Sequence, residues 1–250
     1  MNGQVTLVGL GLSPRDHATI EVLQALAESD EVRAQGFGAK DLAFLRSQCR
    51  PGALKAAPAG GDGKALARQV AAAAKKGRRV ANATPIHPFY FGPAGAAVVA
   101  ACDAAKTPWR SFGAISPMGV AIAEAGVTLG MNVFGLQSFE AEALAAHAVE
   151  PNPVWPLILY FTRTPSAAAR KALAARLKPL YADDREALWC SGARTGRKGT
   201  LAEILRQASA AAPGDTVFLA ASRETKSTLG QTGSDSFSGK GASAPATLED

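Results

Sequence analysis

Residues 5–19 constrain the fold of this chain more than any other segment, because an apolar strand-like run breaks there into a Gly-x-Gly turn and then continues as a helix. Gly9 and Gly11 lack the Cβ atoms that would keep another group away from the backbone. Asp16 is placed to cap the helix that begins near Ala18. A glycine turn between a strand and a helix is typical of α/β folds that bind a nucleotide-like cofactor.

The turn departs from the dinucleotide fingerprint, because Pro14 stands where the third glycine of that fingerprint is needed. The spacing therefore argues against a standard NAD site. Two alternatives stay open for the turn by itself: it approaches a ligand, or it is a tight turn without one.

Strand-like and helix-like runs alternate along the whole chain. In the first half, strands are predicted at 31–33 and 79–83, helices at 20–27, 41–48, 64–76 and 94–105, and a loop at 51–63. In the second half, helices are predicted at 118–124, 139–146, 166–177 and 200–211, and strands at 131–136, 157–161, 187–190 and 216–221. Repeated βα units indicate an α/β fold with mainly parallel sheets covered by helices.

The simplest division of this pattern gives two α/β lobes. We expect an N-terminal lobe with the glycine loop at 1–112 and a C-terminal lobe at 113–224. From about Thr225 the composition turns to Ser, Gly, Thr and Lys without apolar periodicity. Residues 225–250 are therefore predicted to form a flexible or surface-draped tail.

Charge and composition bear on the partners of the chain. Lysine and arginine exceed aspartate and glutamate by six. The basic residues are interpreted as scattered along the chain, with residues 194–198 as the one local cluster. An excess of this size does not indicate a nucleic-acid partner. The cluster itself is expected to be a solvated loop.

The cysteines, Cys49, Cys102 and Cys190, are far apart and odd in number, and the three histidines are dispersed. The sequence thus predicts neither a disulfide framework nor a metal site. No apolar run approaches the ~20 residues of a membrane span, and the chain enters a strand at once rather than a secretory leader. A cytoplasmic protein without membrane contact is expected.

Five segments, taken in order, resemble the tetrapyrrole methylase superfamily. Residues 5–19 resemble its opening strand, glycine loop and helix. HPFYFGP at 87–93 resembles its Gly-Asp-Pro-x-Val-Phe-Gly loop, with Ile86 and His87 in place of the usual glycine and aspartate. The others are GAISP at 113–117, LILYF at 157–161 and GTLAEIL at 199–205. The resemblance extends from Val5 to about Ala221.

This superfamily consists of S-adenosylmethionine-dependent methyltransferases with two α/β lobes. The resemblance therefore implies S-adenosyl-L-methionine in the cleft between the lobes, and a homodimer. The residues implied to shape the floor of the cofactor site are Gly9, Gly11 and Leu12. Those implied to lie beside the methionine portion are His87, Tyr90 and Phe91. Those implied to lie near the adenosine are Ser116, Pro117 and Leu157.

Some of these side chains have a second interpretation. His87 either makes a polar contact in the site or packs beside Pro88. Tyr90 either hydrogen-bonds the methyl acceptor, which would make it catalytic, or packs as the aromatic of its loop. Glu140 is expected to cap the following helix rather than face the cleft, and Tyr160 is expected to lie in the core.

Within the superfamily the chain is most similar to borosin-type peptide backbone α-N-methyltransferases. The similarity rests on Asp16-His17-x-Thr19, on the pair His87-Pro88 and on residues 137–141. It implies methyl transfer to a peptide backbone. The tail lacks the apolar β-branched residues expected of a fused core peptide, so a separate precursor is expected.

One departure from the borosin pattern affects the chemistry. Ala57, Gly63 and Ala67 stand where borosin enzymes carry an arginine and tyrosines that bind and activate the amide. Loss of a hydroxyl base and a cationic stabiliser removes factors of ~10²–10⁴ each in rate. The alternatives are an acceptor of another kind, such as a tetrapyrrole or other small molecule, other activating residues, or a cofactor-binding partner protein without catalysis.

Overall fold

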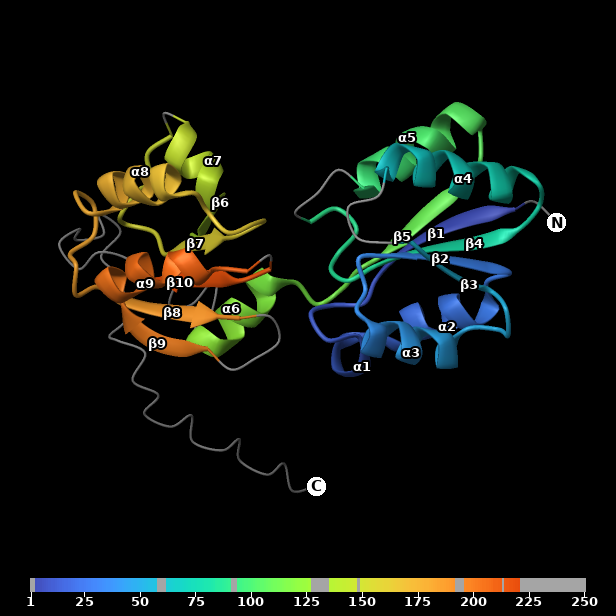
Figure 1. Ribbon diagram of the computed structural model, residues 1–250, viewed down its shortest axis with the longest axis horizontal. Helices are drawn as coiled ribbons and strands as arrows, with labels where there is room; N and C mark the ends of the chain where they lie inside the picture. Colours follow the sequence, from blue (N-terminus) through green and yellow to red (C-terminus); the bar gives the residue numbers. More distant parts are fainter. Residues whose placement is uncertain are drawn as a thin grey trace, which may run out of the picture. The chain divides into compact units, whose positions relative to one another are not determined.

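The structure is a computed structural model that describes residues 3–57, 62–90, 94–126, 135–147, 149–191, 196–212 and 214–220. The chain divides into two compact units, residues 1–117 (unit 1) and 118–250 (unit 2). Each unit has a sheet of its own with helices packed on it (Figure 1). The expected α/β class is confirmed. Residues 225–250, predicted to be a tail, and 131–134 of a predicted strand lie outside the described residues.

Unit 1 contains a five-stranded sheet, called sheet A, in which every strand pair is parallel. Its order is β3-β2-β4-β1-β5. The strands are β1 (Gln4–Gly9), β2 (Glu31–Gln35), β3 (Leu54–Ala57), β4 (Arg79–Thr84) and β5 (Trp109–Phe112). Because the strands are parallel, all five carboxyl ends lie at one edge of sheet A and all five amino ends at the other.

Helices cover both faces of sheet A. The first group is α1 (Pro14–His17), α2 (Ile20–Glu28) and α3 (Ala39–Gln48), and the second is α4 (Gly63–Lys75) and α5 (Ala94–Ala105). Figure 1 shows the two groups on opposite faces. Side chains of β1 alternate accordingly: Val8 packs with Val22 of α2, whereas Leu7 packs with Val70 of α4.

This arrangement makes the boundary between β1 and β4 a topological switch point. The two strands are neighbours, but the chain leaves β1 towards the helices of one face and leaves β4 towards α5 on the other. In open α/β sheets, ligands bind in the crevice outside the carboxyl ends of strands at such a point.

Unit 2 contains a second five-stranded sheet, called sheet C, with the order β6-β7-β10-β8-β9. Its strands are β6 (Gln137–Glu140), β7 (Leu157–Tyr160), β8 (Glu186–Cys190), β9 (Arg197–Thr200) and β10 (Thr216–Leu219). On one face its core includes side chains of α7 (Ala141–Ala146), α8 (Ala167–Leu177), α9 (Leu201–Gln207) and a 3₁₀ turn, Ala208–Ala210. Side chains of α6 (Pro117–Ala125) pack in a separate cluster, with Ile158 and Phe218.

The expectation of mainly parallel sheets is wrong for sheet C. Only β6 and β7 pair in parallel, and the other three pairs are antiparallel. The helical crossovers themselves were predicted correctly, because β6, β7 and β8 run in one direction and β9 and β10 in the other. The antiparallel pairs arise because β10 inserts between β7 and β8, and because β9 pairs beside β8.

Local predictions failed where elements are short. Strands β3, β5 and β9 were not expected, and Phe139 and Glu140 lie in β6 rather than in the following helix. Thr19, not Asp16, caps α2, since its side chain accepts the Val22 N–H at 3.3 Å. Asp16 instead accepts the Ser13 hydroxyl at 2.5 Å.

Lys75 to Arg79 form a second basic run, KKGRR, so the view that 194–198 is the one basic cluster is wrong. Four of these five residues are cations, and all four are exposed.

Every helix among the described residues is too short or too polar to cross a bilayer. Within the same residues, no group of three or more histidine, cysteine or carboxylate side chains is placed to hold a metal ion.

Candidate functional site

Three loops meet at the carboxyl edge of sheet A, at the switch point. They follow β1 (residues 10–13), β4 (85–90 in the described part) and β5 (113–116). Leu10 N donates to Thr84 O at 3.0 Å, which joins the first two loops at their base. The Thr84 hydroxyl donates to Ile86 O at 2.6 Å and holds the second loop against the end of its strand. We call this group of loops the carboxyl-edge site.

Gly9 is the point at which the three loops come together. A Cβ atom at this position would lie 2.6 Å from Ile86 O, 2.7 Å from Ala114 Cβ and 2.9 Å from His87 Cα. Real Cβ atoms do not approach other atoms so closely. The missing side chain of Gly9 therefore makes room for the loops after β4 and β5.

Gly11 has a different reason to be glycine. Its φ of +76° favours glycine, and a Cβ atom would lie 2.5 Å from His17 Cβ. The short helix α1 thus folds back onto the turn, with Leu12 half-buried beside it. The Nδ1 atom of His17 is buried there without a hydrogen-bond partner among the described residues.

His87 is half-buried in the loop after β4, and its ring has a defined hydrogen bond. Nδ1 accepts the Phe89 backbone N–H at 3.2 Å, so the neutral ring carries its proton on Nε2. The ring lies edge-on to Tyr90, with centroids 6.1 Å apart. His87 therefore holds its turn through Nδ1, and its Nε2–H has no hydrogen-bond acceptor within the part of the loop that the structure describes.

The remaining predicted site residues lie in three places. Tyr90 is half-buried beside His87, and Phe91 lies outside the described residues. Ser116 is half-buried and Pro117 is buried where the loop after β5 enters α6. Leu157 is the first residue of β7 in unit 2 and has no exposed surface. The structure thus brings Gly9, Gly11 and His87 together, and the contacts of all these residues with a cofactor stay a prediction.

Two exposed apolar side chains of this edge were not singled out from the sequence. Phe89 is 46% exposed in the loop after β4, and Ile115 is 41% exposed in the loop after β5. The sequence did contain a signal for them, because both are large apolar residues in loops that follow parallel strands. They give the carboxyl-edge site an apolar surface beside its polar groups.

The positions that differ from borosin enzymes lie on the α4 side of sheet A. Ala57 ends β3 and Gly63 begins α4, where a Cβ atom would meet open space. Ala67 is 1% exposed and packs in the core with Leu7 and Val70. A tyrosine at Ala67 would therefore overpack the core instead of reaching solvent.

Residues 137–141 serve unit 2 itself. The Gln137 side chain donates to Asn152 O at 2.6 Å and accepts the Asn152 N–H at 2.9 Å, which fixes the loop before β7. Glu140 caps α7 by accepting the Ala143 N–H at 2.6 Å, as expected, and also accepts the Thr162 hydroxyl at 3.1 Å. These bonds account for two polar side chains of the segment without a ligand.

An open hollow of about 660 Å³ lies in unit 2 rather than at the carboxyl edge of sheet A. It is lined mainly by alanines of α7 and α8, with Arg163 ion-paired to Glu142 at its side. The lining offers no strand ends or glycine turn. This hollow contains none of the residues predicted for the cofactor site.

Residues 4–205 match the family model described as Tetrapyrrole (Corrin/Porphyrin) Methylases. A comparison with curated protein sequences gives no match.

Three solved structures illustrate the likeness of fold. Uroporphyrin-III-C-methyltransferase from Thermus thermophilus is 19% identical with a TM-score of 0.65, over 88% of this chain and 93% of that one. The methyltransferase CobJ is 21% identical with a TM-score of 0.65, over 88% and 95%. The cobalt precorrin-4 methyltransferase CbiF is 14% identical with a TM-score of 0.67, over 86% and 94%.

Proposed function

Because the chain belongs to the tetrapyrrole methylase family, whose members take a methyl group from S-adenosylmethionine, we propose that unit 1 binds this donor at the carboxyl-edge site. The single observation that carries the proposal is the meeting of three loops at Gly9 on the switch point of sheet A. A crevice of this kind is the usual ligand position in open α/β sheets.

The side chains of the carboxyl-edge site fit the chemistry of such a donor. The methionine portion carries a carboxylate that needs hydrogen-bond donors, and His87 offers Nε2–H. Adenine needs an apolar surface, and Phe89 and Ile115 expose one. We propose the floor at Gly9, Gly11 and Leu12, with Tyr90 and Phe91 beside His87. Contacts of Ser116 and Pro117, where the loop after β5 enters α6, with the adenosine form the last part of the proposal.

When bound, the donor supplies an electrophilic methyl group on a sulfonium ion, and the acceptor must face that methyl carbon opposite the sulfur. Catalysis then rests largely on positioning. Tyr90 is the proposed residue for orienting the acceptor, because its half-buried ring lies beside His87.

Titration calorimetry with S-adenosylhomocysteine tests the donor site. Asparagine at position 87 keeps an acceptor near Nδ1 for the Phe89 N–H, whereas glutamine keeps a donor near Nε2. If the ring donates to the ligand, His87→Asn should weaken binding by about tenfold, the equivalent of one charge-assisted hydrogen bond, and His87→Gln should weaken it less.

If His87→Gln instead weakened binding more than His87→Asn, the role of His87 would be limited to holding its turn. A wild-type protein that gives neither heat nor a thermal shift at about millimolar ligand would contradict the donor site itself.

For the acceptor, we propose a small tetrapyrrole-like molecule in preference to a peptide. Ala57, Gly63 and buried Ala67 leave these positions without an amide-activating group, and the names of two of the similar structures refer to uroporphyrin-III and cobalt precorrin-4 methylation. A peptide backbone from a separate precursor is the second candidate, on the resemblance of His87-Pro88. A homodimer is proposed on the resemblance alone.

Mass spectrometry of the products separates these candidates. With labelled donor, we expect methyl groups on a uroporphyrin-type tetrapyrrole and slow or no transfer to a borosin-type peptide. Rapid transfer to the peptide, unchanged in Tyr90→Phe, would contradict both the acceptor and the role of Tyr90. Donor binding without transfer to either acceptor would indicate a partner protein that has lost catalysis.

A further inference from the structure

The amino edge of sheet A, opposite to the carboxyl-edge site, carries a concentrated positive charge. Strands β2, β3 and β4 begin there, and helices α3 and α4 end there. The cations gathered at this edge are Arg33, Arg50, Lys55, Lys75, Lys76, Arg78 and Arg79. All of them except half-buried Arg33 are exposed. We call this group the amino-edge basic surface.

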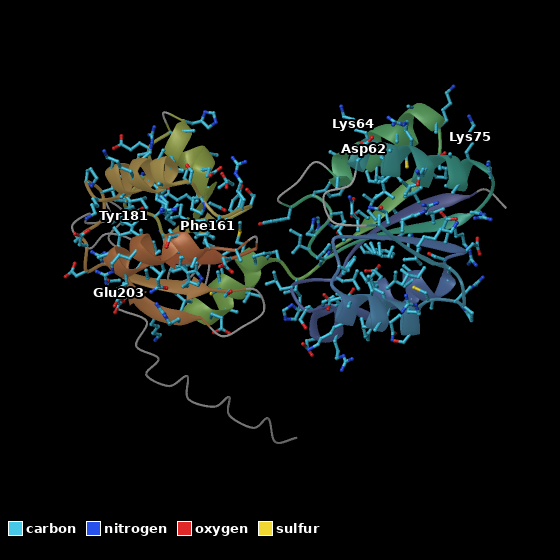
Figure 2. The ribbon with its side chains drawn as sticks, in the orientation of Figure 1. Asp62, Lys64, Lys75, Phe161, Tyr181 and Glu203 are labelled. Atoms are coloured by element: carbon cyan, nitrogen blue, oxygen red, sulfur yellow. The ribbon has the colours of Figure 1, made fainter. Side chains whose placement is uncertain are left out.

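Topology explains why the cations lie together. The run Lys75 to Arg79 spans the end of α4 and the start of β4, so it must turn at this edge. Figure 2 shows Lys75 at the end of α4 that lies away from Asp62 and Lys64. Lys55 of β3 and Arg33 of β2 are register partners and bring two more cations to the same strands.

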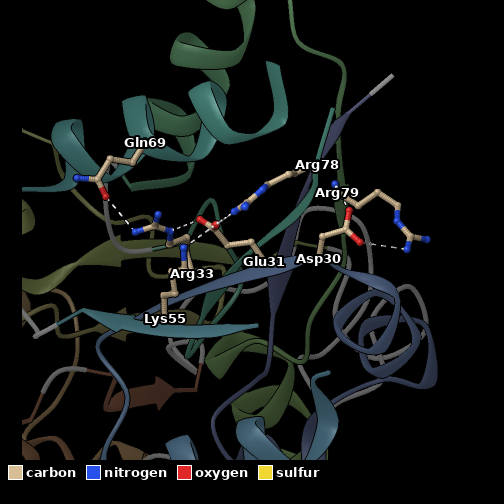
Figure 3. A network of polar contacts seen from close by, with 7 residues as sticks. All are labelled: Asp30, Glu31, Arg33, Lys55, Gln69, Arg78 and Arg79. Atoms are coloured by element: carbon tan, nitrogen blue, oxygen red, sulfur yellow. Dashed lines mark hydrogen bonds and ion pairs between the residues drawn. The ribbon is translucent and has the colours of Figure 1, made fainter. Parts of the chain in front are cut away.

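Two carboxylates hold part of this surface in place (Figure 3). Glu31 accepts Arg33 Nε at 2.5 Å, Arg78 Nη1 at 2.7 Å and Lys55 Nζ at 2.9 Å. Asp30 accepts the Arg79 backbone N–H at 2.9 Å, and Arg50 and Arg79 lie within 3.4 Å of its Oδ1. These contacts fix five of the seven cations on one side, while the side chains of Arg78 and Lys55 remain about half exposed.

The carboxylates do not balance the charge. The surface has seven cations and two carboxylates, Asp30 and Glu31, which is an excess of five positive charges. The whole chain has an excess of six. The other charged residues at the ends of α2, α3 and α5 are Glu28, Arg46, Asp103 and Lys106, whose formal charges sum to zero. Most of the net charge of the protein is therefore at one edge of one sheet.

An exposed aromatic side chain lies at the same edge. Trp109 begins β5, is 39% exposed, and has its Nε1–H bound to Asp103 at 3.0 Å. β1 separates β5 from β4, which places the two strand starts about 10 Å apart. Beside Trp109 is a hollow of about 500 Å³ lined in part by Thr107, whose buried hydroxyl has no partner among the described residues.

We propose that the amino-edge basic surface, together with Trp109, binds single-stranded nucleic acid. Guanidinium groups suit phosphate because they donate two parallel hydrogen bonds, and a held indole provides a face on which a base can stack. An acidic protein would use the cations but has no need of an exposed indole beside a hollow. This proposed function is independent of the methyl-donor site, and it differs from the expectation, drawn from the total charge, that nucleic acid is not a partner.

Fluorescence anisotropy with the full chain and a labelled oligothymidylate of about 20 nucleotides, longer than a site of about 4–16 nucleotides, tests the proposal. Lys75→Glu/Lys76→Glu should weaken binding at least tenfold and reduce the salt slope by about 1.4, since each lost phosphate contact contributes about 0.7. The matched control is Lys40→Glu/Lys171→Glu, which makes the same charge change at exposed positions of α3 and α8 and should bind like the wild type.

Trp109 distinguishes nucleic acid from an acidic protein. Trp109→Ala should weaken binding of the oligonucleotide several-fold, and Trp109→Phe should retain most of it. Competition by polyglutamate as strong as that by unlabelled oligothymidylate, or no effect of Trp109→Ala, would overturn the proposal in favour of an acidic protein. No binding by the wild type at about 50 mM salt, or equal loss in the charge-matched control, would overturn it altogether.

Discussion

Glu31→Gln should lower the free energy of unfolding by about 3 kcal/mol, the lower end of the range for breaking a buried ion pair. The Glu31 side chain is 2% exposed and is the acceptor for Arg33, Lys55 and Arg78. Glutamine keeps the shape but leaves three cations without their counter-charge. Urea unfolding followed by circular dichroism measures the change.

The pH dependence provides a second readout of the same carboxylate. Burial alone would raise the pKa of Glu31, but hydrogen bonds and charges from Lys55 and Arg33 outweigh it and hold the pKa below the ordinary 4.5. Its contribution to stability is therefore complete above about pH 4.5 and is lost as the pH falls through the lower, folded-state pKa. Glu31→Gln should lack this part of the acid transition.

Asp30→Asn is the matched control, because Asp30 lies next in sequence, also binds arginines, and is 37% exposed. Exposed pairs contribute about 0–1 kcal/mol, so this variant should remain close to the wild type. Equal losses in the two variants would mean that burial of Glu31 is not what makes its ion pairs important.

Gly9→Ala should lower the free energy of unfolding by about 2–3 kcal/mol and abolish binding of S-adenosylhomocysteine. The added methyl group would meet Ile86 O, Ala114 Cβ and His87 Cα within 2.9 Å. Two of these atoms belong to the backbone, which cannot turn aside as a flexible side chain can. The loops after β4 and β5 would have to move away from β1, and His87 would move with them.

Gly113→Ala is the control for this change, since a Cβ atom there would meet nothing within 4 Å. It introduces the same methyl group into the same group of loops. A Gly9→Ala protein that unfolds and binds ligand like Gly113→Ala would show that the three loops do not meet at Gly9.

The glycine loop and the crossover pattern could be predicted from the sequence because both have local signatures. Residues 5–19 contain an apolar strand, two glycines and a helix start within fifteen positions, and the structure has β1, the turn and α1 there, with α2 beginning directly afterwards at Ile20. The reason for each glycine could not be predicted. Ile86 O and His17 Cβ are the atoms that exclude a side chain, and both come from segments folded back onto the turn.

The missed strands lack such signatures. β3 (LKAA), β5 (WRSF) and β9 (RKGT) are four residues long and partly exposed, so neither an apolar run nor a clear alternation marks them. The direction of β10 depends on its insertion between β7 and β8, which no local pattern encodes. The burial of Glu31 could not be predicted for the same reason, because its ion pairs come from Lys55 of β3 and from Arg78, just before β4, as well as from Arg33 of β2.

The basic run KKGRR can be read directly from the sequence, but the total charge of the chain does not show that its cations lie together with others in the fold. Its importance depends on where the ends of strands and helices bring the cations together. Parallel strands gather such ends at one edge of a sheet. In this chain, counting charge at each edge of sheet A therefore reveals a concentration of cations that the total charge does not show.

The position of β1 in sheet A also affects synthesis of the protein. β1 pairs only with β4 and β5 among the described strands, so its residues 4–9 have no sheet partner until residues 79–84 have been made. At about 5–20 residues per second, this delay lasts roughly 4–15 seconds. Val5, Leu7 and Val8, which are fully buried in the folded unit, thus leave the ribosome long before the strands that pair with them, and they must remain without their sheet partners while the chain is still growing.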